Sequence, residues 1–211
     1  MACRKTGYRT TWKLRLLAAG VLLMLTAGTR GWWVPLVGWG LVSDTGVGSP
    51  DLILLDNLDL DYQLFEKAAR FNQSGVGRAV LIPVFTSRQD GATPEEFSLE
   101  IVKAMCRVAH LESAQVVPIT AIEPITFNAA RQVGNYLKGT EAGNVLLLTS
   151  GFKSRRLHLI FSKVLGELGI ETYCIPVWNS QRPENWTTTW HGIQEVFLQY
   201  AKLAYYWLWV F

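Results

Sequence analysis

The stretch NVLLLTSGFKSRR, residues 144–156, decides the fold that we expect for this chain. Its apolar run, Val145–Leu148, ends at a turn signal, Gly151, which is typical of a buried parallel strand. A helical stretch follows and carries three cations: Lys153, Arg155 and Arg156. A helix N-terminus favours anions through its unpaired N–H groups and its dipole. The stretch predicts a strand, a turn and a helix with a phosphate or carboxylate site, and a solvated charged turn is the other interpretation.

Short apolar runs alternate with helical patterns over residues 51–208. We expect strands at 51–55, 79–85, 115–119, 144–150 and 170–177, and helices at 62–71, 93–111, 123–137, 154–168 and 187–208. Pro83 lies inside the second strand and weakens that prediction toward its end. Strands that alternate with helices pair in parallel through right-handed crossovers. The expected fold class is α/β, a Rossmann-like three-layer sandwich with a mainly parallel sheet of about five strands.

The N-terminal region has a different composition. Residues 1–15 carry a charge of +5 and no acid, although the whole chain carries only +3. Residues 16–42 are apolar apart from Arg30, and they contain Trp32, Trp33 and Trp39, which resemble an interfacial aromatic belt. We expect a basic cytoplasmic leader at 1–15, a transmembrane signal-anchor at 16–42, a linker at 43–50 and the α/β domain at 51–211. The domain is then extracytoplasmic, on a single-pass protein of the inner (plasma) membrane.

Two other interpretations of this region remain open. The run Leu16–Gly28 is short for a spanning helix, which needs about 20 residues, and it has the length of a cleaved signal peptide. Pro35 and the nearby glycines also allow two short segments that dip into the membrane as a hairpin. The aromatic C-terminal tail is expected at the bilayer surface near the tryptophans of 16–42, and packing on the sheet is the other interpretation for Tyr205 and Leu208. The tail residues are Tyr205, Tyr206, Trp207, Trp209 and Phe211.

Several function classes find no support in the sequence. The part of the chain after the leader is slightly acidic, which argues against nucleic-acid binding. Cys3, Cys106 and Cys174 have no zinc-site spacing, and Cys106 and Cys174 are expected to be core thiols. No strand is followed by a dinucleotide-binding or P-loop fingerprint. We therefore expect neither a metal nor a cofactor.

Polar side chains gather where the predicted strands end. Because the carboxyl ends of parallel strands share one edge of a sheet, these side chains are expected to line one crevice. Asp56 and Glu123 are the candidate catalytic carboxylates. The candidate ligand-binding residues are Asn57, Asn128, Thr149, Ser150, Lys153 and Arg156. Asp59 and Asp61 are expected to cap a helix, and Asn128 either orients a ligand or caps its own helix. Arg155 lies off the helical face of Arg156 and is expected to point to solvent or to an outer partner.

Four segments of the chain resemble the YdcF-like family (domain of unknown function 218), which includes the SanA- and ElyC-like envelope proteins. They are Asp61-Tyr62 with Phe65 and Ala68-Ala69, residues 123–130 (EPITFNAA), residues 147–156 (LLTSGFKSRR), and the closing pattern from Trp186 to Tyr206. Leu55-Asp56-Asn57 stands where the family has a glycine-rich turn, and Lys153 stands where it often has histidine. The resemblance implies a Rossmann-like domain, membrane-anchored in many members, with roles in envelope or peptidoglycan-related processes.

These observations lead to two expectations about function. The first is a membrane-anchored extracytoplasmic domain that binds or processes a phosphorylated or anionic cell-envelope precursor, such as a lipid-linked glycan. The second is a non-catalytic interaction domain that docks a membrane partner through its aromatic C-terminal helix. The expected partners are the lipid bilayer and the anionic glycan, and no nucleic acid.

Overall fold

A computed structural model describes residues 11–87 and 95–210, and five strands form one sheet within these ranges. The strands are β1 (Leu52–Leu55), β2 (Ala79–Ser87), β3 (Ala114–Thr120), β4 (Asn144–Ser150) and β5 (Glu171–Val177). Every neighbouring pair is parallel, and the order is β3-β2-β1-β4-β5. The α/β fold class and the five-stranded sheet are therefore confirmed, and the sheet is parallel throughout.

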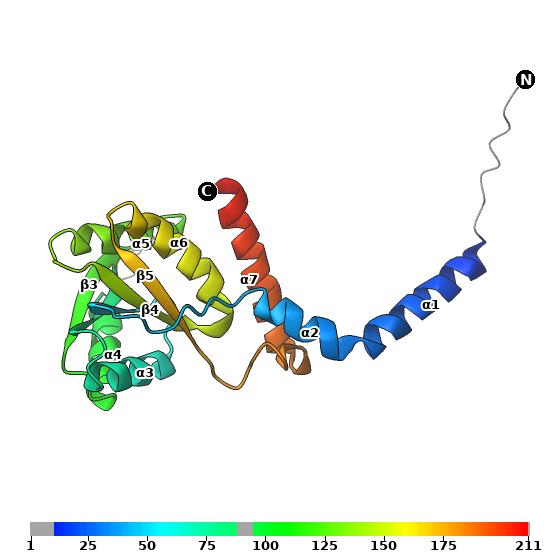
Figure 1. Cartoon of the computed structure of the whole chain (residues 1–211), viewed down its shortest axis with the longest axis horizontal. Coiled ribbons are helices and arrows are strands. Elements are labelled where there is room, and N and C mark those ends of the chain that lie inside the picture. Colours follow the sequence, from blue (N-terminus) through cyan, green and yellow to red (C-terminus); the bar gives the residue numbers. More distant parts are fainter. Residues whose placement is uncertain (1–10, 88–94, 211) are drawn as a thin grey trace, which may run out of the picture.

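Helices cover both faces of the sheet (Figure 1). One face is covered by α3 (Tyr62–Gln73) and α4 (Glu95–Val108), and the other by α5 (Ile125–Leu137) and α6 (Ser154–Gly166). The expected start of α4 at Thr93 lies outside the described residues. Asp61 caps α3 as expected, because its side chain accepts a hydrogen bond from the Gln63 N–H. The three layers match the Rossmann-like sandwich.

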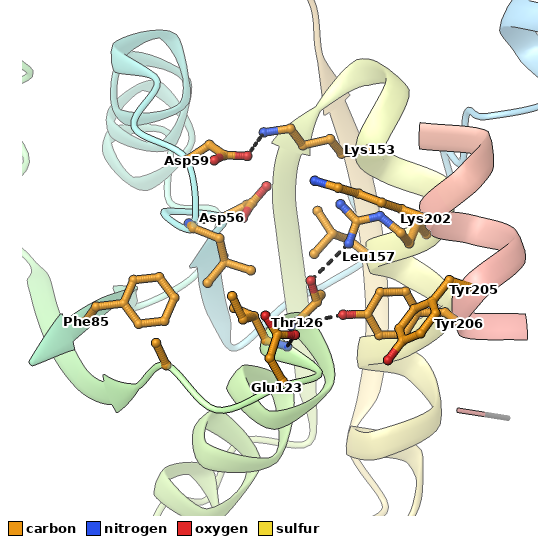
Figure 2. Close-up of a pocket in the computed structure, with 14 residues that line it drawn as sticks. Asp56, Asp59, Phe85, Glu123, Thr126, Lys153, Leu157, Lys202, Tyr205 and Tyr206 are labelled. Carbon is orange, nitrogen blue, oxygen red and sulfur yellow. Dashed lines mark hydrogen bonds and ion pairs between the residues drawn. The ribbon is translucent and has the colours of Figure 1, made fainter. Parts of the chain in front are cut away.

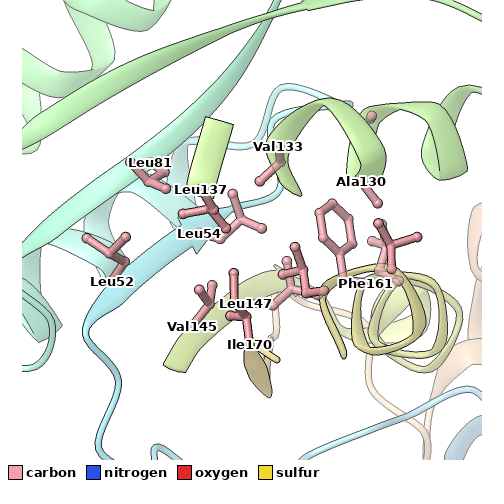
Figure 3. Packing of buried hydrophobic residues seen from close by; sticks show 14 of the residues in the cluster. Leu52, Leu54, Leu81, Ala130, Val133, Leu137, Val145, Leu147, Phe161 and Ile170 are labelled. Atoms are coloured by element: carbon pink, nitrogen blue, oxygen red, sulfur yellow. The ribbon is translucent and has the colours of Figure 1, made fainter. Parts of the chain in front are cut away.

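Strand β1 explains why the sheet lies at the centre. Its sequence LILL is buried at all four positions, as expected for a parallel strand covered on both faces. Leu52 and Leu54 join the cluster under α5 and α6, where Leu147, Val133 and Phe161 pack (Figure 3), while the alternate residues of β1 face α3 and α4. This alternation follows from the two-residue period of a strand.

Strand β2 continues through Pro83 to Ser87, farther than the sequence predicts. β1 pairs only with Ala79–Leu81 of β2, so the later residues have a ladder partner on the β3 side alone. Proline is tolerated in such an edge-like position because one of its sides has no ladder partner. The end of β2 therefore extends past β1 and brings Phe85 to the rim of the sheet.

Three further helices lie outside the three layers of the sandwich. They are α1 (Trp12–Gly28), α2 (Arg30–Trp39) and α7 (Trp190–Trp209), and the last is preceded by the short helix η2 (Trp186–Thr188). α1 buries no residue and projects away from the domain (Figure 1). No single helix in the described ranges is long and apolar enough to cross a membrane. α1 and α2 meet that criterion only as a pair, which is bent by 70°.

The segment expected as a linker, 43–50, packs against β5 and α6. The Thr45 N–H donates to the Cys174 carbonyl over 3.0 Å, and the Cys174 N–H donates to Thr45 Oγ1 over 2.8 Å. Ser43 Oγ lies 2.6 Å from His158 Nδ1. Cys174 is fully buried, and burial raises the pKa of its thiol to about 12. The segment therefore holds a defined position along the sheet.

In the aromatic C-terminal tail, the position of Tyr206 differs from the one that the sequence predicts. This side chain is only 6% exposed and packs into the cluster under α5 and α6, so its expected place at a bilayer surface is wrong. Trp207 and Trp209 are exposed, and Phe211 lies outside the described residues. The reason is helical spacing, because one face of α7 covers the sandwich and Tyr206 falls on that face.

Candidate functional site

A cavity of about 480 Å³ opens at the carboxyl ends of the strands, a size in the usual range for small-molecule sites. β1 lies between β2 and β4, where the strand order reverses direction, and open α/β sheets bind ligands at this switch point. The polar lining residues are Asp56, Asp59, Glu123, Thr126, Lys153, Arg156 and Lys202. The apolar and aromatic ones are Leu58, Phe85, Ala121, Ile125, Leu157, Tyr205 and Tyr206. Phe85 lies across the pocket from the two tyrosines (Figure 2).

Asp56 directly follows the last residue of β1 and is only 5% exposed. Thr149, at the end of β4, donates its hydroxyl hydrogen to Asp56 Oδ2 over 2.8 Å, and the Leu58 N–H donates to Oδ1 over 3.3 Å. Burial raises the pKa of Asp56, against the opposing effect of the Lys153 charge and the Thr149 hydrogen bond. A carboxyl group whose pKa is raised holds its proton more readily than an exposed one, which suits an acid or base in catalysis.

Arg156 is the most unusual cation of the site, because it is 5% exposed. Its Nη1 donates to Thr126 Oγ1 over 2.9 Å, and its Nε and Nη2 donate to Gln199 Oε1 over 3.3 Å. These acceptors are neutral, and no carboxylate in the described ranges lies within 4.0 Å of the guanidinium. Burial lowers the pKa of Arg156, in opposition to the charge of Asp56. A buried cation without a paired anion is costly, and a bound anion would remove that cost.

Two lysines join Arg156 around the cavity. Lys153 Nζ lies 2.5 Å from Asp59 Oδ2 at one end of the pocket (Figure 2), and the Lys153 side chain is 15% exposed. Lys202 comes from α7, and partial burial together with the charges of Arg156 and Lys153 lowers its pKa. Burial is the larger cause, and the contributions of Arg156 and Lys153 show that Lys202 faces two other cations at this side of the pocket.

Tyr206 contributes a hydroxyl group to the wall that α7 also supplies with Lys202. Its Oη accepts a hydrogen bond from the Thr126 N–H over 3.2 Å (Figure 2). No other partner of this hydroxyl is found among the described residues, so its own hydrogen remains available to a ligand. The Arg156 guanidinium carbon lies 5.8 Å from the Tyr206 ring centre, and this contact supports the position of the cation.

The turn after β4 places the two cations that the sequence singled out. β4 ends at Ser150, a single 3₁₀ turn covers Gly151–Lys153, and α6 begins at Ser154. Gly151 lies directly against the Trp178 ring, where a Cβ would clash, so the position requires glycine. Lys153 and Arg156 are three residues apart and therefore share one side of the helix start. The first turn of α6 holds no acid, so its positive dipole adds to the cationic charge.

The structure brings together four of the eight predicted site residues as lining residues: Asp56, Glu123, Lys153 and Arg156. Thr149 lies directly behind them, fully buried, and acts through Asp56. The other three predicted residues do not line the cavity. Asn57 donates to the Pro83 carbonyl over 2.9 Å, and Asn128 donates to the Ile122 and Pro124 carbonyls over 3.2 and 3.4 Å, so both hold loops. Ser150 starts the 3₁₀ turn.

Arg155 points away from the cavity, as expected from its helical angle. Its Nη1 donates to the Gly40 carbonyl over 2.7 Å, and its N–H donates to the Leu41 carbonyl over 3.1 Å. The outer partner is therefore the end of α2. A cation near the C-terminal carbonyl groups of a helix is stabilising.

Sequence reasoning missed the contribution of α7. Lys202 and Tyr206 are four residues apart, on the face opposite the exposed Trp190 and Phe197. The amphipathic pattern of α7 was a usable signal, because a polar residue on the buried face of a core-facing helix needs a partner or a ligand. Asp59 was expected to cap a helix and instead meets Lys153.

The site offers three cations, acidic groups and hydroxyl donors in one pocket. Among the described residues, no group of three or more His, Cys, Asp or Glu is placed to hold a metal ion. In comparisons with known proteins, no family model and no curated protein matches this chain. The resemblance to the YdcF-like family therefore rests on the quoted sequence segments.

Proposed function

We propose that this protein is a membrane-anchored, extracytoplasmic YdcF-like domain that binds or processes a phosphorylated or anionic precursor of the cell envelope, such as a lipid-linked glycan. The ligand occupies the cavity between the ends of β1 and β4. The observation that carries the proposal is Arg156, a buried guanidinium that lines the cavity and whose hydrogen-bond acceptors among the described residues are all neutral.

The charges around Arg156 support a phosphate rather than a neutral ligand. Its three hydrogen bonds leave two of the five guanidinium N–H groups for a ligand. Guanidinium groups bind phosphate in a bidentate manner, which adds geometric specificity to the charge. Lys153 and Lys202 line the same cavity, so they supply further charge. Phe85 and Tyr205 provide apolar surface for the part of the ligand that carries the phosphate.

Processing of the ligand would fall to Asp56. Its raised pKa fits a group that donates a proton to a leaving oxygen or takes one from an attacking water. Glu123 lines the cavity as well and accepts a hydrogen bond from the Ile125 N–H over 3.2 Å, which fixes its position. Arg156 and Lys153 would stabilise the charge on the phosphate oxygens.

The location at a membrane is supported by the N-terminal region. The leader carries +5 without an acid, and such a leader stays on the cytoplasmic side. α1 begins inside this leader, at Trp12, and its exposed surface is almost entirely apolar from Leu16 to Gly28. A helix this short can be matched to a bilayer by local thinning and by flanking cations, such as Lys13 and Arg15, that reach to the headgroups. α1 would then hold the α/β domain on the outer side.

A thermal-shift experiment tests the proposal. The full chain in detergent is heated with sugar phosphates, nucleotides or polyprenyl phosphates, and each compound has its non-phosphorylated counterpart as a control. We expect stabilisation by phosphorylated compounds alone, since a ligand that binds only the folded state raises Tm by mass action. If each phosphorylated compound and its counterpart behave alike, the anion-binding proposal is wrong.

A second function has its own observation. α7 exposes a stripe of large apolar side chains, with Trp190, Phe197 and Leu208 each more than half exposed. Such a stripe favours a non-catalytic interaction domain that docks a membrane partner through its aromatic C-terminal helix. Replacing Phe197 with Ser distinguishes the two functions, because it removes part of the stripe without touching the cavity. Loss of partner binding with unchanged anion binding would favour the interaction domain.

A further inference from the structure

The two faces of α2 have opposite surroundings. The inner face packs on the domain, where Val34 is 3% exposed and its carbonyl accepts a hydrogen bond from Trp186 Nε1 over 2.8 Å. The outer face carries Trp32, Leu36 and Trp39, which are 83%, 70% and 50% exposed. Spacings of four and three residues place these three side chains along one side of the helix. α2 therefore presents a continuous apolar stripe outward.

The position of α2 on the domain is fixed by polar contacts at its C-terminal end. Tyr200 Oη donates to the Val37 carbonyl over 2.7 Å. Arg155, in the first turn of α6, donates to the Gly40 and Leu41 carbonyls. The Ser43 N–H donates to Ser154 Oγ over 2.9 Å. α6 also carries Arg156, so these contacts fix the distance between the outer stripe of α2 and the cavity.

The bend between α1 and α2 is also held by hydrogen bonds. Trp33 Nε1 donates to the Thr26 carbonyl over 2.9 Å, which joins the two helices. Arg30 Nη2, just after the bend, donates to Thr187 Oγ1 over 2.9 Å, which joins the bend to the domain. With a bend of 70°, a helix α1 that enters a bilayer along its normal leaves α2 closer to the bilayer plane than to the normal.

We infer that α2 is a membrane-surface helix whose outer stripe, Trp32, Leu36 and Trp39, lies in the headgroup region of a lipid bilayer. This inference rests on the proposed function in one respect, the entry of α1 into the bilayer. The stripe continues directly from α1, which buries none of its residues, so the surface that meets α1 also meets α2. Trp32, the most exposed ring of the stripe, suits an interface because it has an apolar body and a polar N–H, and the half-exposed Trp39 is held at the other end by its hydrogen bond to Glu184 Oε1 over 3.1 Å.

The consequence concerns the position of the pocket. α2 is attached to the membrane surface on one side and to the first turn of α6 on the other, through Arg155 and Ser154. The cavity is thereby held near the membrane surface instead of swinging on a flexible linker. A ligand with a lipid tail in the same bilayer can then bring its phosphate to Arg156 without leaving the membrane.

Site-specific fluorescence in vesicles tests the inference. The full chain, with Cys3→Ser and Cys106→Ser, is reconstituted into vesicles of phosphatidylethanolamine and phosphatidylglycerol. An environment-sensitive dye is attached to Leu36→Cys on α2, Leu23→Cys on α1 or Val108→Cys on α4. The native residues at these positions are 70%, 70% and 65% exposed, so the three labels start from similar exposure and none replaces a core side chain. Cys174 is fully buried and does not react with the dye. α4 lies on the far side of the domain from α1 and α2 (Figure 1).

We expect the Leu36 label to be quenched by nitroxides on lipid headgroups, the Leu23 label by nitroxides deep in the acyl chains, and the Val108 label only by aqueous iodide. A Leu36 label as open to iodide as the Val108 label, with the Leu23 label still buried, overturns the inference and leaves the anchor intact. Equal depth at Leu36 and Leu23 also overturns it, because α2 would then be part of the inserted segment. Iodide access at Leu23 overturns the anchor itself and the inference with it.

Discussion

Thr149 donates its hydroxyl hydrogen to Asp56 Oδ2 over 2.8 Å, and this contact joins the ends of β4 and β1 at the switch point of the sheet. Both side chains are buried, yet Asp56 still reaches the cavity. The bond holds the carboxyl group in one orientation. Burial raises the pKa of Asp56, and the Lys153 charge, the Thr149 hydrogen bond itself and the Arg156 charge act in the opposite direction. Several properties of the protein should depend on this arrangement.

The pKa of Asp56 predicts how the Asp56→Asn variant responds to pH. The pKa of folded Asp56 is raised above its ordinary value of 3.8, because burial disfavours the charged form. The contribution of this group to stability is therefore fully present below pH 3.8 and is lost as the pH rises through the folded pKa. Asparagine resembles the protonated form at every pH. We expect Asp56→Asn to raise Tm at neutral pH and to lose that advantage toward acid pH.

Asp51→Asn is the matched control, because the pKa of Asp51 is lowered where that of Asp56 is raised. Hydrogen bonds from the Asn144 and Gly143 N–H groups lower the pKa of Asp51. Its contribution to stability is present above the unfolded pKa and is lost as the pH falls through the folded pKa. Asp51→Asn should lower Tm at neutral pH and have little effect in acid. Melting curves over a pH series check both variants. If the Tm of both variants changes in the same direction at neutral pH, the opposite pKa shifts of Asp56 and Asp51 are wrong.

The ion pair between Asp59 and Lys153 should compete with anion binding. Asp59 is 70% exposed, so the pair contributes only about 0.2–1 kcal/mol to stability. Asp59→Asn frees the Lys153 ammonium for a ligand and should strengthen phosphate binding while leaving Tm almost unchanged. Glu66→Gln breaks a similar exposed pair with Arg70, away from the cavity, and serves as the control. Weaker binding by Asp59→Asn would mean that Asp59 itself contacts the ligand.

Tyr206→Phe should destabilise the fold. The variant removes the only acceptor found for the buried Thr126 N–H within the described chain, and an orphaned buried donor costs about 1–3 kcal/mol. Tyr205→Phe is the control, since that side chain is 46% exposed and its hydroxyl has no hydrogen-bond partner among the described residues. Denaturant unfolding of both variants checks the difference. Equal free energies of unfolding would show that the Tyr206 hydroxyl does not support α5.

Arg155→Ala should loosen α2 without weakening anion binding. The variant removes the bond from Arg155 Nη1 to the Gly40 carbonyl, worth about 0.5–1.5 kcal/mol. Hydrogen exchange of the α2 amides should become faster, while α5 and α6 stay protected. Arg70→Ala, which removes a cation from the surface of α3, should leave α2 unchanged. If α2 exchanges at the same rate in both variants, Arg155 does not hold this helix.

The sequence predicted the sheet well because its signals are local. The apolar runs 51–55 and 144–150 and the intervening helices lie within a few residues of their observed bounds. Their parallel pairing then places Asp56, Glu123, Lys153 and Arg156 at one edge, so half of the predicted site follows from topology alone. The outward direction of the Arg155 side chain likewise followed from helical geometry.

The part of the site that the sequence did not predict depends on contacts between distant segments of the chain. Asn57 was expected at the ligand, and Asn128 either at the ligand or as a cap of its own helix, but both side-chain amides donate to carbonyl groups of neighbouring loops. Tyr206 and Lys202 come to the cavity only because α7 packs beside α6, about 50 residues after Arg156 in the sequence. Nothing in the local pattern of the tail separates Tyr206, which is buried, from Trp207, which is exposed, except the exact rotation of the helix.

The central claim is that Arg156 binds a phosphate group, and calorimetric titration of the full chain in detergent tests it most directly. The ligand is the phosphorylated compound that stabilises the protein best, and the variants are Arg156→Gln and Arg155→Gln, each checked for folding by circular dichroism. Gln keeps a hydrogen-bond donor for Thr126 but removes the charge. We predict that Arg156→Gln loses about 1.5–3 kcal/mol of binding free energy, roughly ten- to hundredfold in affinity. Arg155→Gln should bind like the wild type. Equal affinity of all three proteins, with folding intact, would contradict the account.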